Sequence, residues 1–217
     1  MKIGVFDSGI GGTTVLKEIK KLLPNEEYYY IADSKNCPYG EKTDKELFPI
    51  VKNNVDTLKK WGARIIVIAC NTATTRCIKM LRETYPELIF VGTEPAIKLA
   101  AQTGKKNILV LATPGTLQSE QTAKLLNENQ QPNQIINLLP CPGLADCIET
   151  NLGKNETLID NKLDELLSEQ KNNYDVIVLG CTHYPLIKAK IQKKFPTALL
   201  IDGGEGVAKQ VKRLISS

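Results

Sequence analysis

The chain of 217 residues has no apolar run that approaches the roughly 20 residues needed to span a bilayer. Its first residues, MKIGVFDSG, reach an aspartate and glycines before the core of an export signal could form, so no such signal is expected. The composition, 42% hydrophobic and 24% charged, is that of a soluble globular protein. We therefore expect a cytoplasmic protein with no membrane partner.

The sequence also lacks the closely spaced cysteine and histidine residues that are typical of metal-binding motifs. The sequence has one histidine and no Cys-x-x-Cys pair, so a zinc site lacks its usual ligand pattern, and no metal is expected. Six cysteines would suit a disulfide framework in a small secreted protein, but this chain is neither small nor visibly secreted. Cys77, Cys141 and Cys147 are interpreted as small buried hydrophobic residues.

No strong excess of one charge is present. The chain has 28 basic and 24 acidic side chains, a net charge of +4. Basic pairs such as Lys20-Lys21 lie in the polar phase of amphipathic segments, which is typical of solvated helix faces. A nucleic-acid partner is therefore not expected.

Short runs rich in valine and isoleucine alternate with longer amphipathic stretches, which predicts an α/β fold with parallel sheets and helices on both faces. The expected strands are 2–6, 28–32, 64–69, 89–91, 107–112, 135–138, 175–179 and 199–201. The expected helices are 13–23, 42–61, 72–85, 95–102, 117–127, 156–170, 185–194 and 206–215. Pro49 predicts a kink or a late start in the second helix.

The chain repeats itself. A strand followed by a small residue, cysteine and threonine occurs around Cys70 and again around Cys181, and segment 3–9 resembles segment 108–115. These repeats predict two similar doubly wound halves related by pseudo-twofold symmetry, with the active site between them. We expect the first half to span 1–96, completed by 205–217, and the second to span 97–204.

Polar clusters follow five of the expected strands. They are Asp7-Ser8-Gly9, Asp33 with Pro38-Tyr39-Gly40, Cys70-Asn71-Thr72, Thr113-Pro114-Gly115 and Cys181-Thr182-His183. Ligands of open α/β sheets bind beyond the carboxyl ends of the strands, so the clusters predict one shared cleft.

The glycine-rich segment 7–12 allows two interpretations. It lacks the Gly-Lys-Ser/Thr of a phosphate loop, and Asp7 would repel phosphate. Free N–H groups at a helix start suit a carboxylate, and an aspartate beside them suits an ammonium group, which together describe an amino acid. The alternative is a tight turn in which Asp7 caps the helix.

Cys70 and Cys181 each lie between a strand and a helix, where the field of the helix N-terminus is expected to lower the thiol pKa. Two such groups on opposite sides of a substrate could invert a stereocentre, because one removes a proton and the other delivers one. His183 could tune Cys181, and Asp7 could do the same for Cys70. The pair therefore predicts a racemase.

The motifs match a known family. They are GVFDSGIGG (4–12), AD followed by CPYG (32–40), IACNTA (68–73), LATPGT (111–116) and LGCTHYP (179–185). Over nearly its whole length the chain resembles the glutamate racemases of the aspartate/glutamate racemase superfamily. The resemblance implies an enzyme that needs no pyridoxal phosphate or metal cofactor and that supplies D-glutamate for the peptidoglycan of the bacterial cell wall.

The resemblance also implies residue roles. Cys70 would deprotonate D-glutamate and Cys181 L-glutamate, with Asp7, His183 and Glu149 assisting the proton transfers. The expected substrate contacts are Asp7, Ser8, Tyr39, Gly40, Asn71, Thr72, Thr113, Thr182 and His183. Glu149 rests on the weakest match, because CPGLADCIE (141–149) departs from the family pattern.

Two alternatives stay open: a racemase for aspartate or another acidic amino acid, and a non-catalytic amino-acid-binding paralogue. No basic residue occurs in the five clusters to grip a shorter side chain, which favours glutamate. Thiol redox catalysis would need the two sulfurs close enough to bond, whereas a racemase needs room for an α-carbon between them.

The oligomeric state is not given by the sequence, and a homodimer is one alternative.

Overall fold

The eight apolar runs form the strands of two parallel sheets in a computed structural model that describes residues 1–170 and 173–216. Position 217, the last of the expected segment 205–217, lies outside these residues. The strands are β1 (Lys2–Asp7), β2 (Glu27–Ala32), β3 (Ile65–Ile68), β4 (Ile89–Gly92), β5 (Asn107–Ala112), β6 (Ile135–Pro140), β7 (Val176–Leu179) and β8 (Leu199–Ile201). All the expected strands are therefore present.

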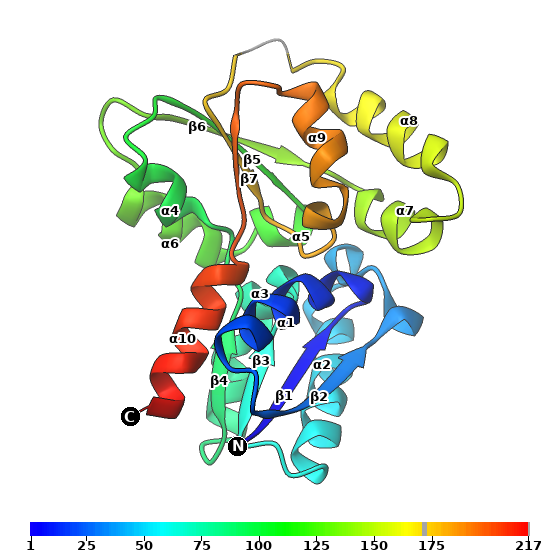
Figure 1. Cartoon of the computed structure of the whole chain (residues 1–217), viewed down its shortest axis with the longest axis vertical. Coiled ribbons are helices and arrows are strands. Elements are labelled where there is room, and N and C mark those ends of the chain that lie inside the picture. The colour runs from blue at the N-terminus through cyan, green and yellow to red at the C-terminus, as the bar shows by residue number, and fades with distance from the viewer. Residues whose placement is uncertain (171–172, 217) are drawn as a thin grey trace.

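The two sheets have the same topology. Their strand orders are β2-β1-β3-β4 and β6-β5-β7-β8, and every neighbouring pair is parallel. Figure 1 shows each sheet in a lobe of its own, with the first lobe below and the second above. The predicted fold class, two similar doubly wound α/β halves, is confirmed.

Helices cover both faces of each sheet. They are α1 (Thr13–Leu22), α2 (Asp44–Lys60), α3 (Asn71–Thr84), α4 (Ile97–Gln102), α5 (Pro114–Leu117), α6 (Glu120–Asn129), α7 (Leu144–Asn151), α8 (Glu156–Leu167), α9 (Lys188–Lys194) and α10 (Gly204–Ser216). Short 3-10 helices are η1 (Ile10–Gly12), η2 (Ser34–Asn36), η3 (Tyr39–Glu41) and η4 (Tyr184–Ile187).

Alternating side chains of the central strands explain this layering. In the first lobe, Ile65 and Val67 of β3 pack with α1 and α10, while Ile66 and Ile68 pack with α2 and α3. The second lobe repeats the scheme, with α7, α8 and α9 on one face of β5 and β7 and α4 and α6 on the other. Successive side chains of a strand point to opposite faces, so a strand buried on both sides reads as a continuous apolar run.

Three details differ from the expectation. Helix α2 begins at Asp44 and continues through Pro49, so a late start there is wrong. The reason is the capping box of Thr43 and Glu46, which satisfies free N–H groups at its first turn. Helices α5 and α7, of four and eight residues, were not expected, because each is shorter than the roughly 11 residues over which an apolar stripe becomes recognisable.

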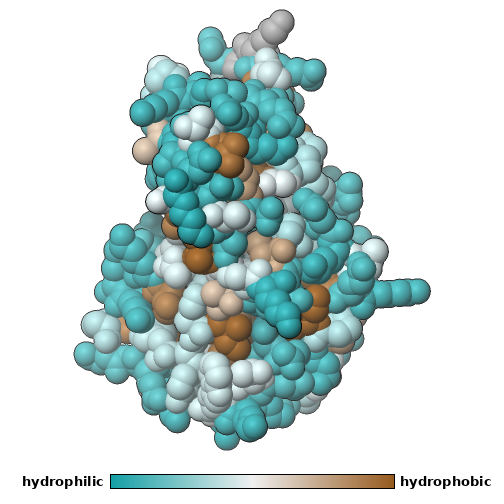
Figure 2. All heavy atoms as spheres, turned by 90° about the vertical axis from the view of Figure 1, so that its right-hand side faces the viewer, coloured by the Kyte–Doolittle hydropathy of each residue, from teal (hydrophilic) through white to brown (hydrophobic). Residues whose placement is uncertain are grey.

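The face of the molecule seen in Figure 2 is mostly polar. Figure 2 shows hydrophobic side chains in small separate groups on one face of the molecule. Among the described residues, no helix combines the length and apolar character that crossing a membrane requires.

Helix α10 returns from the second lobe and packs against α1 in the first, where Val207, Ala208 and Val211 share a core with Ile19. We predict that Ile19→Ala lowers the free energy of unfolding by about 2–5 kcal/mol, because it leaves a cavity in this fully buried layer. Urea unfolding measures the loss. The exposed Lys17→Ala on the same helix should change little, and equal losses in both variants would contradict a packed α1–α10 core.

Candidate active site

The central strands of both sheets end at the boundary between the lobes. Asp7 ends β1 and Cys70 follows β3 in the first lobe, while Thr113 follows β5 and Cys181 follows β7 in the second. In each sheet these two strands are neighbours at the topological switch point, where the strand order changes direction: β1 and β3 in the first sheet, β5 and β7 in the second. Ligands of doubly wound sheets bind at such points, and here the two points face each other.

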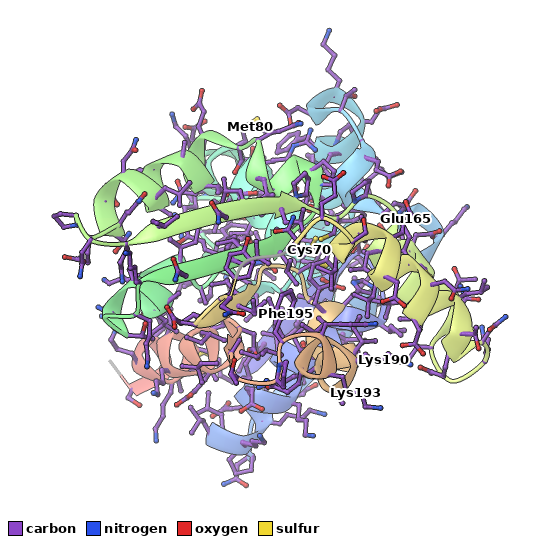
Figure 3. All side chains as sticks on the ribbon, turned by 90° about the horizontal axis from the view of Figure 1, so that it is seen from above. Cys70, Met80, Glu165, Lys190, Lys193 and Phe195 are labelled. Atoms are coloured by element: carbon purple, nitrogen blue, oxygen red, sulfur yellow. The ribbon has the colours of Figure 1, made fainter. Side chains whose placement is uncertain are left out.

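Both cysteines line one small cavity between the lobes. Its lining residues are Ser8, Pro38, Tyr39, Gly40, Cys70, Asn71, Thr72, Thr113, Ala145 and Cys181. Seen from above, Cys70 lies near the middle of the molecule (Figure 3). The cavity has a volume of about 10 Å³, which holds roughly one water molecule. The site is therefore closed.

The environment of Cys70 is buried and negative. Its side chain is 5% exposed, precedes α3, and donates a 3.8 Å hydrogen bond to Ser8 Oγ. Burial, together with the charge of Asp7, raises the pKa of the Cys70 thiol. The expectation that the helix N-terminus lowers this pKa is wrong, because desolvation and a nearby carboxylate outweigh the favourable backbone N–H of Ala73.

Asp7 is buried behind Cys70 and organises the glycine-rich turn. Its Oδ2 accepts hydrogen bonds from the backbone N–H groups of Gly9 and Gly12, at 3.1 and 3.0 Å, and its Oδ1 accepts one from Thr182 Oγ1 at 3.0 Å. This geometry corresponds to the tight-turn interpretation of the segment. Burial raises the pKa of Asp7, although the charge of His183 opposes the shift.

Cys181 belongs to a chain of three polar side chains. Its Sγ lies 3.8 Å from His183 Nδ1, and His183 Nε2 lies 2.7 Å from Glu149 Oε2. Burial lowers the pKa of His183, but its hydrogen bonds with Cys181 and Glu149 outweigh burial and raise it to about 10. Burial raises the pKa of Glu149, but its hydrogen bonds, above all with His183, bring it down to about 2. The imidazole therefore carries a proton over the neutral range.

Glu149 also joins the two lobes. It lies on α7 of the second lobe, and in the first lobe its carboxylate accepts hydrogen bonds from the Ile10 backbone N–H at 2.8 Å and from Ser34 Oγ. The sequence offered only a weak match for Glu149, yet the fold brings it to His183. Ser34 was not expected here, and its exposed position in the sequence pattern gave no signal.

Threonines form a second bridge between the lobes. Thr72 Oγ1 of α3 lies 2.9 Å from Thr113 Oγ1 and 3.1 Å from Thr116 Oγ1. Tyr39 lines the cavity, and its hydroxyl donates a hydrogen bond to Asp33 Oδ2 at 2.6 Å. Asp33, which belongs to one of the expected clusters, does not line the cavity but is bonded to Tyr39, which does.

The expected site residues fall into two layers. Ser8, Tyr39, Gly40, Asn71, Thr72 and Thr113 line the cavity with the two cysteines, whereas Asp7, Glu149, Thr182 and His183 lie outside the lining. Ala145 lines the cavity but was not expected, because its helix α7 was not recognised in the sequence.

Two glycines of the first lobe allow its close approach to the second. A Cβ on Gly11 would lie 2.7 Å from the backbone nitrogen and Nδ1 of His183, and a Cβ on Gly40 would lie 2.6 Å from Thr113 Cβ. Real Cβ atoms do not approach other atoms so closely, so the closed arrangement requires glycine at both positions.

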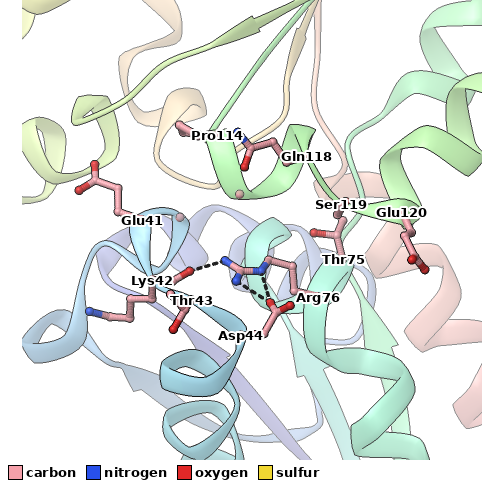
Figure 4. Close-up of a pocket in the computed structure, with 12 residues that line it drawn as sticks. Glu41, Lys42, Thr43, Asp44, Thr75, Arg76, Pro114, Gln118, Ser119 and Glu120 are labelled. Carbon is pink, nitrogen blue, oxygen red and sulfur yellow. Dashed lines mark hydrogen bonds and ion pairs between the residues drawn. The ribbon is translucent and has the colours of Figure 1, made fainter.

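A larger cleft opens to solvent beside the closed cavity, and Gly40 lines both. The cleft has a volume of about 780 Å³ and lies between segment 40–44 and Arg76 of the first lobe and Pro114–Glu120 of the second (Figure 4). Arg76 does not offer a free charge there, because it pairs with Asp44 and donates to the Lys42 carbonyl.

Comparison with known proteins identifies the family of this fold and site. Residues 3–211 match the family model described as Asp/Glu/Hydantoin racemase. The chain belongs to the Asp/Glu/hydantoin racemase family. The cysteine pair and the motifs predict that the protein is a racemase, which is a kind of isomerase. This prediction is confirmed.

Several glutamate racemases resemble the chain over most of their length. The Clostridium botulinum (strain Alaska E43 / Type E3) enzyme is 42% identical over 213 residues, which cover 97% of this chain and 82% of the relative. The Escherichia coli enzyme, solved with L-glutamate and the activator UDP-MurNAc-Ala, has a TM-score of 0.89 at 32% identity. The match covers 99% of this chain and 82% of the E. coli chain. The Francisella tularensis subsp. tularensis SCHU S4 enzyme, solved with D-glutamate, has a TM-score of 0.83 at 29% identity. The match covers 99% of this chain and 80% of the F. tularensis chain.

The His183–Glu149 pair predicts a pH dependence. The raised pKa of His183 stabilises the fold fully below its ordinary value of 6.5, and this contribution is lost as the pH rises towards about 10. The lowered pKa of Glu149 stabilises the fold above its ordinary value of 4.5, and this contribution is lost as the pH falls towards about 2. The two contributions are both complete between pH 4.5 and 6.5.

We predict that Glu149→Gln lowers the pKa of His183, because the amide cannot offer a negative charge. The racemase has one histidine, so NMR titration of an untagged, chelator-treated protein reports this ring alone. Asp146→Asn on the same helix serves as the control and should leave the titration in place. An unchanged midpoint in Glu149→Gln would show that the pair is not coupled.

We predict that Gly11→Ala holds the lobes apart and lowers the racemase rate by roughly 100-fold, since a displacement of about 1 Å can cost this much. Gly206→Ala on α10, where a Cβ would meet nothing within 4 Å, is the matched control. Circular dichroism checks that both variants fold. Equal activity of the two variants would contradict the requirement for close approach.

Proposed function

We propose that the protein interconverts L- and D-glutamate by moving the α-proton between Cys70 and Cys181, without a cofactor. The observation that carries this proposal is the position of both thiols: they follow equivalent strands of the two lobes and line the same buried cavity. The similarity to glutamate racemases solved with each enantiomer supports glutamate as the substrate.

Two-base chemistry accounts for every proton. The Cys181 thiolate removes the α-proton of L-glutamate, and the Cys70 thiol delivers its own proton to the opposite face of the carbanion. D-Glutamate leaves behind a protonated Cys181 and a Cys70 thiolate. The reverse reaction starts from that state, so neither thiol needs an outside proton when turnover alternates between the enantiomers.

The two thiols have different electrostatic surroundings. Asp7 places a negative charge near Cys70, which favours the neutral thiol. His183, whose pKa is raised to about 10, lies 3.8 Å from Cys181 Sγ, so the two thiols have neighbours of opposite charge.

Substrate entry requires the lobes to separate. Glutamate has ten heavy atoms, whereas the closed cavity of about 10 Å³ holds roughly one water. The cleft that shares Gly40 with the cavity provides a path from solvent. Once inside, the substrate would be held by the polar lining, with Asp7, Thr182 and His183 acting from the layer behind it.

Other parts of the expectation remain proposals. We propose that the first half consists of 1–96 completed by 205–217 and that the second half is 97–204. We also propose that the protein supplies D-glutamate for peptidoglycan and that it is located in the cytoplasm. The return of α10 to the core of the first lobe supports the proposed division.

We predict that the wild-type protein exchanges the α-proton of both glutamate enantiomers in deuterated water, and that Cys70→Ala and Cys181→Ala each lower interconversion by about 100-fold or more. Each variant loses one of the two proton-transfer groups, so neither can complete inversion. Proton NMR follows the exchange and circular dichroism follows the change of configuration.

Cys147→Ala serves as the control, because this thiol lies on α7 outside the cavity lining. Aspartate in a parallel reaction tests the alternative substrate. The proposal fails if wild type exchanges no α-proton, or if either alanine variant interconverts the enantiomers at the wild-type rate.

A further inference from the structure

Cys37 lies beside the site but has no part in the proposed reaction. It is a partly exposed thiol between η2 and η3, in the first lobe. The sulfur of Cys37, one carboxylate oxygen of Glu149 and one ring nitrogen of His183 all lie within 4.8 Å of one another. Within the part of the chain that the structure describes, this is the one group of three or more such side chains.

The three donor atoms are a ligand set for zinc. Thiolate sulfur, imidazole nitrogen and carboxylate oxygen are the atoms that bind Zn²⁺ in proteins. Two ligands of one tetrahedral zinc ion lie about 3.3–3.8 Å apart, given bond lengths of about 2.0–2.3 Å. The group is within about 1 Å of that spacing: the 2.7 Å contact between His183 and Glu149 must lengthen, and any pair near 4.8 Å must shorten.

The charge around the group also suits a cation. The carboxylates of Glu149, Asp7 and Asp146 all act electrostatically on Cys37. A divalent cation that displaces the His183 proton would take over the favourable interaction with these carboxylates. Because Cys37 and Glu149 are partly exposed, an ion can reach them from solvent, whereas His183 behind them is fully buried.

We propose that Cys37, Glu149 and His183 form a binding site for a zinc-like divalent cation that inhibits the enzyme. Binding replaces the Cys37 thiol proton and the proton on the His183 nitrogen that otherwise faces Glu149, and both protons are released to solvent. The open coordination position is left to water. The sequence expectation of no metal concerned closely spaced ligands, whereas these three come from separate segments.

Inhibition follows from two consequences of binding. The ion removes His183 from the chain of hydrogen bonds that leads to Cys181. It also ties Cys37 of the first lobe to Glu149 and His183 of the second, so the closed lobes cannot separate to admit substrate. This effect on catalysis rests on the proposed function, but the binding of the ion does not.

Zinc and cobalt titrations of the chelator-treated full chain test the site. We expect one Zn²⁺ per chain by equilibrium dialysis, a rise in the thermal unfolding midpoint, and, with Co²⁺ under anaerobic conditions, the intense near-ultraviolet absorption of a cobalt–thiolate bond. Cys37→Ser should lose this absorption and weaken zinc binding by at least 10-fold. Cys147→Ser, a partly exposed thiol on α7, should behave like wild type.

Activity provides a second comparison. Zn²⁺ should inhibit wild type and Cys147→Ser, while Cys37→Ser keeps its basal rate and resists the ion. A rival site would use Cys181 Sγ with His183 Nδ1, which lie 3.8 Å apart. Cobalt absorption that is lost in Cys181→Ser but kept in Cys37→Ser would overturn the proposal.

The two proposals fail in different ways. Zinc binding that is equally tight in wild type and Cys37→Ser, or no zinc binding at all, overturns the metal site even if racemisation is observed. Conversely, a protein that shows no racemisation but loses cobalt absorption in Cys37→Ser contradicts the proposed function and supports the metal site.

Discussion

The contact between the glycine-rich turn of the first lobe and the His183–Glu149 pair of the second is the constraint on which the site depends. Glu149 receives the Ile10 N–H, Thr182 donates to Asp7, and Gly11 leaves the space that His183 occupies. A side chain on this turn would separate the lobes. Because both catalytic candidates lie next to this contact, the geometry that closes the lobes is also the geometry that brings the two thiols to one cavity.

Two cysteines at equivalent positions have different electrostatic surroundings. The aspartate at the end of β1 acts on Cys70, whereas the residue at the corresponding end of β5 is Ala112, and Cys181 instead has a protonated imidazole beside it. The fold is therefore symmetric in topology and asymmetric in charge.

The same closure imposes a cost. Charged groups buried at the boundary are tolerated because each is hydrogen-bonded, and the bonds that Glu149 accepts from Ile10 and Ser34 cross from one lobe to the other. Opening the lobes would break those bonds and change the charge state that His183 prefers. The Glu149 carboxylate thus contacts both the opposite lobe and His183, and it is the same carboxylate that the proposed cation would occupy.

The sequence by itself determined the strands, the two similar halves and the convergence of polar clusters, because apolar runs and strand-end residues are local patterns that a parallel sheet brings to one edge. It did not reveal α7, which begins after Gly143 without a side-chain cap and is only eight residues long. The direction of the Cys70 pKa shift and the neighbours of Cys37 were decided only by the tertiary structure. Both depend on burial and on distances through space between segments that are far apart in the chain, which no local pattern contains.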